Sequence, residues 1–115
     1  MGAIFIPYNK DNSVEVEKGY IVDNYLQKSE NMGYSVVRTH LDGCHPLMKN
    51  TLSNRTYYII EGFSNFKVDG ETFKLKQGDT LTIPRDTLYK FDGKFSAILI
   101  SCPAFDEKYD IIFRE

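Results

Sequence analysis

The side chains of this chain whose ordinary pKa lies nearest neutrality are two histidines and two cysteines. His40 and His45 have the chemistry of a general base, and His45 precedes Pro46, where a lone histidine more commonly hydrogen-bonds to the backbone. Cys44 and Cys102 fall in different predicted strands of a chain whose start lacks an export signal, so we expect reduced thiols. The sequence therefore contains side chains suited to proton transfer, and a redox role of the cysteines is a minor alternative.

Short apolar segments with strand periodicity position these side chains. Residues 57–60 contain two tyrosines and two isoleucines, which suit a pleated, half-buried surface. Asp69-Gly70 is a strong hairpin signal because its turn requires positive φ. On either side, over 65–68 and 72–76, apolar and polar residues alternate, which is the period of a strand with one face in water.

Glycines and a proline divide the rest of the chain at nearly regular intervals. Pro84 ends the predicted strand 80–83 because proline has no donor for the sheet ladder. We expect turns at Asp42-Gly43, Glu61-Gly62, Gln77-Gly78-Asp79 and Asp92-Gly93. Such spacing predicts an all-β sandwich or barrel.

The first third of the chain is less regular. Residues 4–8 and 14–17 are predicted as short strands, and residues 20–26 fit either a strand or a single helical turn. Residues 27–33 are polar and end in glycine, which predicts a loop before a further strand over 34–41.

Composition excludes several classes of protein. The 115 residues, of which 42% are hydrophobic and 14% aromatic, suffice for one core and one domain. A net charge of −2 without a basic stripe argues against nucleic-acid binding. No apolar stretch approaches the roughly 20 residues that cross a bilayer. We therefore expect a cytoplasmic protein with neither nucleic acid nor membrane as a partner.

The order and spacing of these anchors resemble the cupin superfamily over approximately Val36 to Asp106. Gly43 and Gly62 have the separation of the two glycines in the usual first cupin motif, and Gly78 and Pro84 match the usual second motif. The segments 68–71 and 102–106 also resemble sequence segments that are typical of the family. The resemblance implies an all-β fold, a double-stranded β-helix (cupin or jelly-roll barrel) in a single domain.

The same comparison implies that the metal-binding motifs are degenerate. The four positions where cupins carry three ligands of the first motif and one of the second hold Lys49, Thr51, Arg55 and Tyr89. Lysine and arginine offer only donor hydrogens and positive charge. A small shift of register that brought His45 inward would still leave an incomplete ligand set. We therefore expect no metal and no cofactor.

The resemblance also implies a substituted pocket. Alternation along the strands would point Arg55 and Tyr57 inward in one row and Tyr89 and Phe91 in a second, with His45 near the barrel mouth. A buried guanidinium requires a partner. That partner is either a carboxylate, phosphate or sugar hydroxyl of a ligand, or an internal acid, for which the candidates are Glu61, Asp79 and Asp86.

Three functions are compatible with such a pocket. The first is a binding module for a small anionic or sugar-like ligand, without a metal. The second is a metal-independent sugar epimerase or isomerase with His45 as base and Tyr89 as acid. The third, a metal-dependent dioxygenase or isomerase, is disfavoured by the missing ligands.

Residues 1–33, outside most of the resemblance, are expected to form strands and a loop that act as a dimerisation arm. Residues 34–115 are expected to form the barrel, and the expected assembly is a homodimer.

Overall fold

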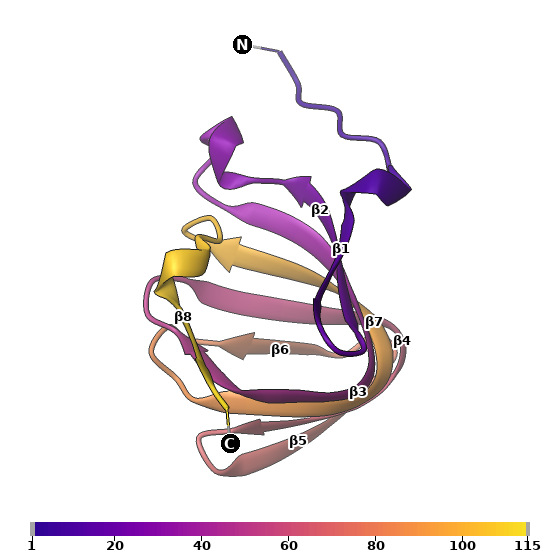
Figure 1. The fold of residues 1–115 in the computed structure, drawn as a ribbon, viewed down its shortest axis with the longest axis vertical. Helices are drawn as coiled ribbons and strands as arrows, with labels where there is room; N and C mark the ends of the chain where they lie inside the picture. Colours follow the sequence, from indigo (N-terminus) through magenta and orange to yellow (C-terminus); the bar gives the residue numbers. More distant parts are fainter. Residues whose placement is uncertain (1, 115) are drawn as a thin grey trace.

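The computed structural model describes residues 2–114, which fold into one antiparallel sheet curled into a barrel (Figure 1). The strands are β1 (Ser13–Glu17), β2 (Tyr20–Leu26), β3 (Ser35–Asn50), β4 (Asn54–Val68), β5 (Glu71–Lys76), β6 (Thr80–Ile83), β7 (Tyr89–Cys102) and β8 (Asp110–Phe113). Three short 3-10 helices are η1 (Lys10–Asn12), η2 (Lys28–Glu30) and η3 (Glu107–Tyr109). The all-β jelly-roll prediction is confirmed.

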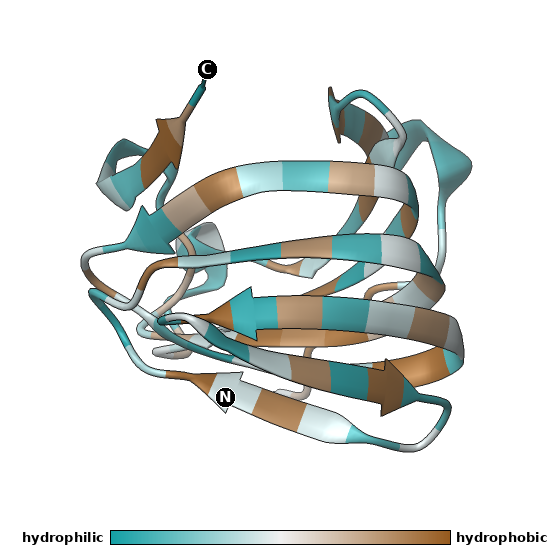
Figure 2. Cartoon of the chain, turned by 90° about the horizontal axis from the view of Figure 1, so that it is seen from below, coloured by the Kyte–Doolittle hydropathy of each residue, from teal (hydrophilic) through white to brown (hydrophobic). Residues whose placement is uncertain are grey.

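The three long strands β3, β4 and β7 form the centre of the sheet. Neighbouring strands follow the order β1-β2-β3-β7-β4-β5, with β6 pairing with β4 and β8 with β3. Because β3, β4 and β7 bend sharply halfway, each contributes to both walls of the barrel (Figure 1). Apolar and polar bands alternate along the strands in Figure 2, and the apolar side chains that face inward form the core.

Three of the predicted turns are wrong, because the chain bends there without reversing. Gly43, Gly62 and Gly93 lie inside β3, β4 and β7, and Gly43 pairs directly with Gly93. These glycines have positive φ, which a barrel corner requires as well as a hairpin turn. A glycine in the sequence therefore does not show which of the two structures is formed. The Asp69-Gly70 hairpin and the turn before Thr80 are confirmed.

The N-terminal third is partly as predicted. Residues 14–17 lie in β1, and residues 20–26 form strand β2 rather than a helical turn. The strand predicted over 4–8 is wrong, because this segment has no sheet partner within the described chain, and its Phe5 is 87% exposed. Strand β2 pairs with β3, so this region extends the barrel sheet; its role in joining two copies stays a prediction.

Within the part of the chain that the structure describes, no helix has the length and apolar character needed to span a membrane.

Candidate functional site

A cavity of about 510 Å³ opens at the end of the barrel where β8 and η3 lie. Several of its polar lining residues come from separate elements: Tyr20 from β2, His45 from β3, Asp110 from β8, and Glu17 and Arg114, which form an ion pair. The apolar walls are formed mainly by Val14, Val16, Val22, Val37, Met48, Leu99 and Ile112. Apolar walls with a few convergent polar groups are typical of small-molecule sites.

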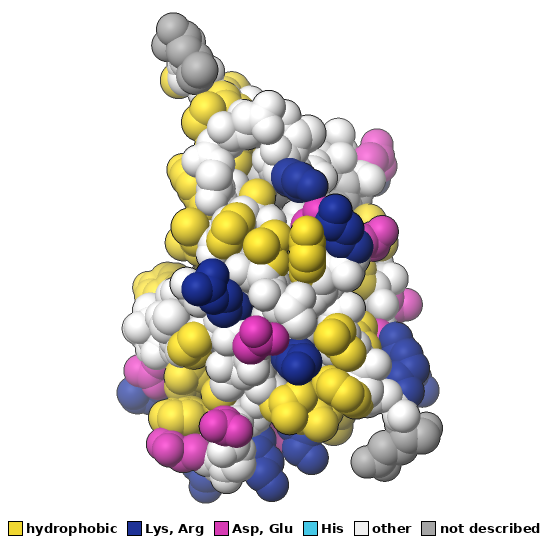
Figure 3. All heavy atoms as spheres, turned by 90° about the vertical axis from the view of Figure 1, so that its left-hand side faces the viewer, with side chains coloured by type: hydrophobic (Ala, Val, Ile, Leu, Met, Phe, Trp, Pro, Cys, Tyr) yellow, Lys and Arg dark blue, Asp and Glu magenta, His cyan; other side chains and the backbone are white. Residues whose placement is uncertain are grey.

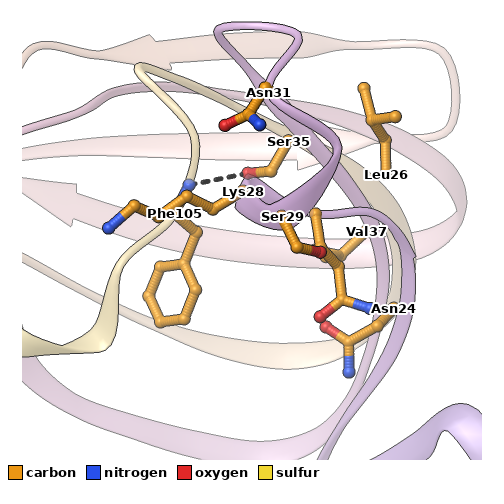
Figure 4. Close-up of a pocket in the computed structure, with 9 residues that line it drawn as sticks. Asn24, Leu26, Lys28, Ser29, Asn31, Ser35, Val37 and Phe105 are labelled. Carbon is orange, nitrogen blue, oxygen red and sulfur yellow. Dashed lines mark hydrogen bonds between the residues drawn. The ribbon is translucent and has the colours of Figure 1, made fainter.

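The cavity continues into two neighbouring hollows. Figure 4 shows a pocket of about 480 Å³ beneath η2, where the Phe105 N–H donates a hydrogen bond of 2.9 Å to Ser35 Oγ. This pocket shares Asn24, Ser35, Val37 and Phe105 with the main cavity. On the other side, a groove of about 780 Å³ shares His45 and Arg114 with it. Figure 3, which views the molecule from the left-hand side of Figure 1, shows apolar and charged side chains interspersed over that face.

His45 is held in one tautomer by its own strand. A register irregularity between His45 and Met48 turns the Pro46 carbonyl toward the ring, and Nδ1 lies 2.8 Å from that oxygen. Because a carbonyl oxygen only accepts, Nδ1 carries the proton, and Nε2 of the neutral ring has a free lone pair. The ring stacks on Phe91 at 4.7 Å between centroids and meets the edge of Tyr20 at 5.2 Å.

Burial keeps His45 and the neighbouring phenols uncharged. The pKa of His45 is lowered because its surroundings desolvate the imidazolium. Burial likewise raises the pKa of the Tyr20 and Tyr57 phenols well above the usual value. At neutral pH the site therefore contains a neutral imidazole acceptor beside phenols that remain donors.

The lowered pKa of His45 predicts a pH-dependent stability. Because the unfolded chain binds this proton more readily, the contribution of His45 is fully present above pH ~6.5 and is lost as the pH falls below it toward the folded pKa. We expect the free energy of unfolding to fall between pH 7.5 and 5.5, and to fall less in His45→Gln. Urea titrations of both proteins at the two pH values measure the difference. An equal fall in the free energy of unfolding of both proteins would show that the folded His45 keeps an ordinary pKa.

Arg55 is neutralised from within the chain. Its guanidinium, 4% exposed, donates through Nη2 to Asp110 Oδ1 and through Nη1 to the Tyr89 hydroxyl, both at 3.0 Å. The Tyr57 and Tyr89 hydroxyls lie 2.9 Å apart, and Asp110 Oδ1 also accepts from Asn50 Nδ2 at 2.7 Å. An internal partner was one of the two alternatives open at the sequence level.

The acid that fulfils this role is not among the three candidates read from the sequence. Glu61 accepts from Ser96, Asp79 pairs with Lys76, and Asp86 lies 4.0 Å from the Lys49 amine. Asp110 was missed because it is 55 positions from Arg55 and meets it only when β8 pairs with the end of β3.

The five predicted site residues form one connected cluster, but they do not share one surface. His45 lines the cavity, and Phe91 lies beneath its ring and borders the neighbouring groove. Arg55, Tyr57 and Tyr89 are not among the cavity-lining residues and form a buried layer behind Asp110.

Other residues that line the cavity were not predicted from the sequence. Tyr20, Glu17, Asp110 and Arg114 all contribute to its surface. The alternation of Tyr20, Val22 and Asn24 was the available signal for the wall formed by β2, and it was not distinguishable from an ordinary strand.

The residues at the expected metal position do not fit a cation. Arg55 places a positive charge there, and it already donates to the Tyr89 hydroxyl and to the Asp110 carboxylate, while the Tyr57 hydroxyl bonds to that of Tyr89. Within residues 2–114, no group of three or more His, Cys, Asp or Glu side chains is placed to hold a metal ion. Cys44 and Cys102 are both free and exposed.

Known proteins resemble this chain mainly in fold. No protein-family model matches the sequence. An uncharacterized protein of Methanocaldococcus jannaschii is 41% identical over 47 residues, which cover 41% of this chain and 38% of that protein's length.

Solved structures match nearly the whole chain. Streptomyces Pac13, described as a nucleoside dehydratase, superposes with a TM-score of 0.83 at 24% identity, covering 96% of this chain and 92% of Pac13. A Tyr-to-Phe variant of Pac13 with uridine gives 0.84 at 24%, covering 97% and 93%. KdgF from Halomonas sp. gives 0.79 at 17% identity, covering 93% and 99%. The comparisons therefore show that this chain has a cupin-type fold.

Proposed function

We propose that the cavity beside His45 binds the hydroxylated, uncharged body of a small molecule of sugar or nucleoside type, without a metal. The observation that carries this proposal is the pairing of the cations nearest the cavity: Arg114, which lines it, with Glu17, and Arg55, which lies behind its wall, with Asp110. No free guanidinium is left among the described lining residues for an anion, so an anionic group at Arg55 is disfavoured. The likeness in fold to Pac13, a structure of which contains uridine, supports the same ligand class.

The polar groups of the cavity match a hydroxylated ligand. His45 Nε2 is an acceptor, and Tyr20, which also lines the cavity, has a phenol that burial keeps protonated. Asp110 uses Oδ1 for Arg55 and Asn50, while Oδ2 has no hydrogen-bond partner within residues 2–114. Sugar hydroxyls both donate and accept, and the valine-rich walls suit the apolar faces of a sugar or base ring.

Ligand binding is expected to raise the melting temperature of the protein. A thermal-shift panel of uridine, other nucleosides and free sugars provides the measurement, and a ligand at 100 times its Kd adds about 2.7 kcal/mol of stability. Val16→Trp should abolish the shift, because Val16 lines the cavity yet is 51% exposed, so the indole blocks the site without disturbing the core.

The matched control is Ile21→Trp, which adds an indole to the same β1–β2 hairpin at a residue that does not line the cavity. This variant should respond to ligand as the unmodified protein does. A panel without any shift, an equal shift in Val16→Trp, or loss of binding after treatment with a chelator would contradict the proposal.

A second candidate function is metal-independent proton transfer on the same ligand. It is favoured by His45, whose neutral ring and free Nε2 lone pair suit a general base at the cavity wall. His45 Nε2 would remove a proton from a carbon acid of the ligand and return a proton to the same carbon. Tyr89 is not placed to act as the acid, because its hydroxyl is buried against Arg55 and Tyr57. Pac13 structures with uridine include variants at a histidine and at tyrosines.

Solvent exchange separates catalysis from binding. With a ligand that binds, an active protein in D₂O should exchange the acidic carbon-bound hydrogen, as followed by proton NMR. His45→Gln should slow the exchange by roughly 10²–10⁴-fold while binding persists. Binding without exchange by the unmodified protein would leave the binding module as the function.

A further inference from the structure

The groove that adjoins the cavity at His45 contains lysines that are unpaired within the described chain, whereas the cations nearest the cavity are paired with acids. It is about 780 Å³ in volume and lies over the outer face of β4 and β7. Its charged lining residues are Lys67 and Lys90, the cation Arg114, which is already paired with Glu17, and one carboxylate, Asp92. The groove therefore carries an excess of positive charge on a chain whose net charge is −2.

Lys67 and Lys90 occupy directly opposite positions on the paired strands β4 and β7. Like charges placed opposite each other destabilise a sheet, whereas a lysine opposite an acid stabilises it. Neither lysine has an ion-pair partner within residues 2–114. The neighbouring carboxylate, Asp92, is held by the Asn65 side chain at 3.1 Å instead. The arrangement thus lowers stability where a single acidic substitution would raise it, as is common at functional sites.

The groove reaches His45 through an irregularity in the sheet. Between His45 and Met48, strand β3 departs from its register with β7, and Pro46 and Leu47 line the groove at that point. His45 and Phe91, stacked on each other, therefore border the groove as well as the core of the barrel. A ligand body in the cavity could extend a substituent past His45 toward Lys67 and Lys90.

We propose that this groove is an anion subsite that binds a phosphoryl group, with Lys67 and Lys90 as its charges. Ammonium groups on flexible stems suit a phosphate as point charges, and bound phosphate would relieve the repulsion between them. The part of this inference that joins the subsite to the cavity rests on the proposed function. The subsite itself rests on the groove and its lysines.

A wider basic surface is the competing explanation. Lys74, opposite Asn65 in the next cross-strand row, extends the positive charge beyond the groove. An extended polyanion would use that row as well, whereas a phosphoryl group needs only the concave part that Lys67 and Lys90 line. The concavity and its continuity with His45 favour the phosphoryl group.

Inorganic phosphate tests the subsite without reference to any ligand. At constant ionic strength, phosphate should raise the melting temperature of the unmodified protein and shift the amide resonances of residues around Lys67 and Lys90. Lys67→Glu should melt at a higher temperature without phosphate, because the introduced carboxylate would face Lys90 as an opposite charge, and should lose the response to phosphate. Lys74→Gln is the matched control and should keep it.

Three results would overturn the subsite: no effect of phosphate on the unmodified protein, an undiminished response in Lys67→Glu, or an equal loss in Lys74→Gln. Uridine and uridine 5′-monophosphate then test its link to the cavity. The monophosphate should bind several-fold more tightly than uridine, and Lys67→Glu should remove that advantage without changing uridine binding. Phosphate binding without nucleoside binding would support the subsite and contradict the proposed function, so the two fail separately.

Discussion

Asp110→Asn is expected to destabilise the protein by about 3–5 kcal/mol, because it leaves the Arg55 guanidinium buried without a counter-charge. The loss is large relative to the stability of about 5–15 kcal/mol that is common for single domains. Urea denaturation at neutral pH measures it directly. Asp110 also accepts from Asn50, so the effect includes the weakening of a hydrogen-bonded network rather than of one contact.

Two further variants separate charge burial from simple loss of a contact. Lys28→Gln removes the ion pair with Asp106 and should leave the stability almost unchanged, because the Lys28 side chain is 63% exposed and Lys108 still lies 3.9 Å from the Asp106 carboxylate. Arg55→Met combined with Asp110→Leu should recover much of the stability lost in Asp110→Asn, because neither charge remains to be desolvated. If the double variant is as unstable as the single one, the pair contributes through shape and hydrogen bonding rather than through charge.

Gly62→Ala is expected to have a still larger effect, above about 4 kcal/mol, and to leave little folded protein. At Gly62 the backbone has φ +86°, and a Cβ would lie 2.1 Å from the Lys94 carbonyl oxygen and 2.8 Å from the Phe95 Cα. Both atoms belong to the backbone of β7, so relief of the clash requires β4 and β7 to separate at the barrel corner. The fraction of soluble folded protein and its melting temperature are the measurements.

Gly70→Ala is the matched control because Gly70 has the same φ of +86° with nothing within 4 Å of the added Cβ. It should lose only the cost of the left-handed backbone conformation, about 1–3 kcal/mol. The difference between the two variants isolates the close approach of the strands. Equal losses would mean that the corner relaxes around a methyl group.

The cluster around His45 shows which part of the site sequence patterns were able to predict. Alternation along 55–59 and 89–91 was sufficient to predict that Arg55, Tyr57, Tyr89 and Phe91 turn to the same side as the core, because side chains on a strand alternate faces. The same alternation does not indicate how deeply each side chain is buried. Three of these residues are buried behind the cavity rather than exposed to it, and depth depends on which segment covers them.

The covering segment is the C-terminal strand β8, which had no place in the sequence analysis. Its four residues pair with 47–50 of β3 and bring Asp110 onto Arg55. A strand of this length carries too little periodicity to be recognised, and its charge becomes meaningful only beside a partner 55 positions away.

The sequence by itself determined the all-β class, the hairpin at Asp69-Gly70 and the inward rows of the long strands, because alternation and turn residues act between neighbours in the chain. The tertiary structure decided which glycines bend a strand and which reverse it, which acid neutralises Arg55, and that Lys67 stands opposite Lys90 beside His45. These outcomes depend on strand register and on contacts between distant segments, and register is set by the packing of the whole barrel rather than by any one stretch of residues.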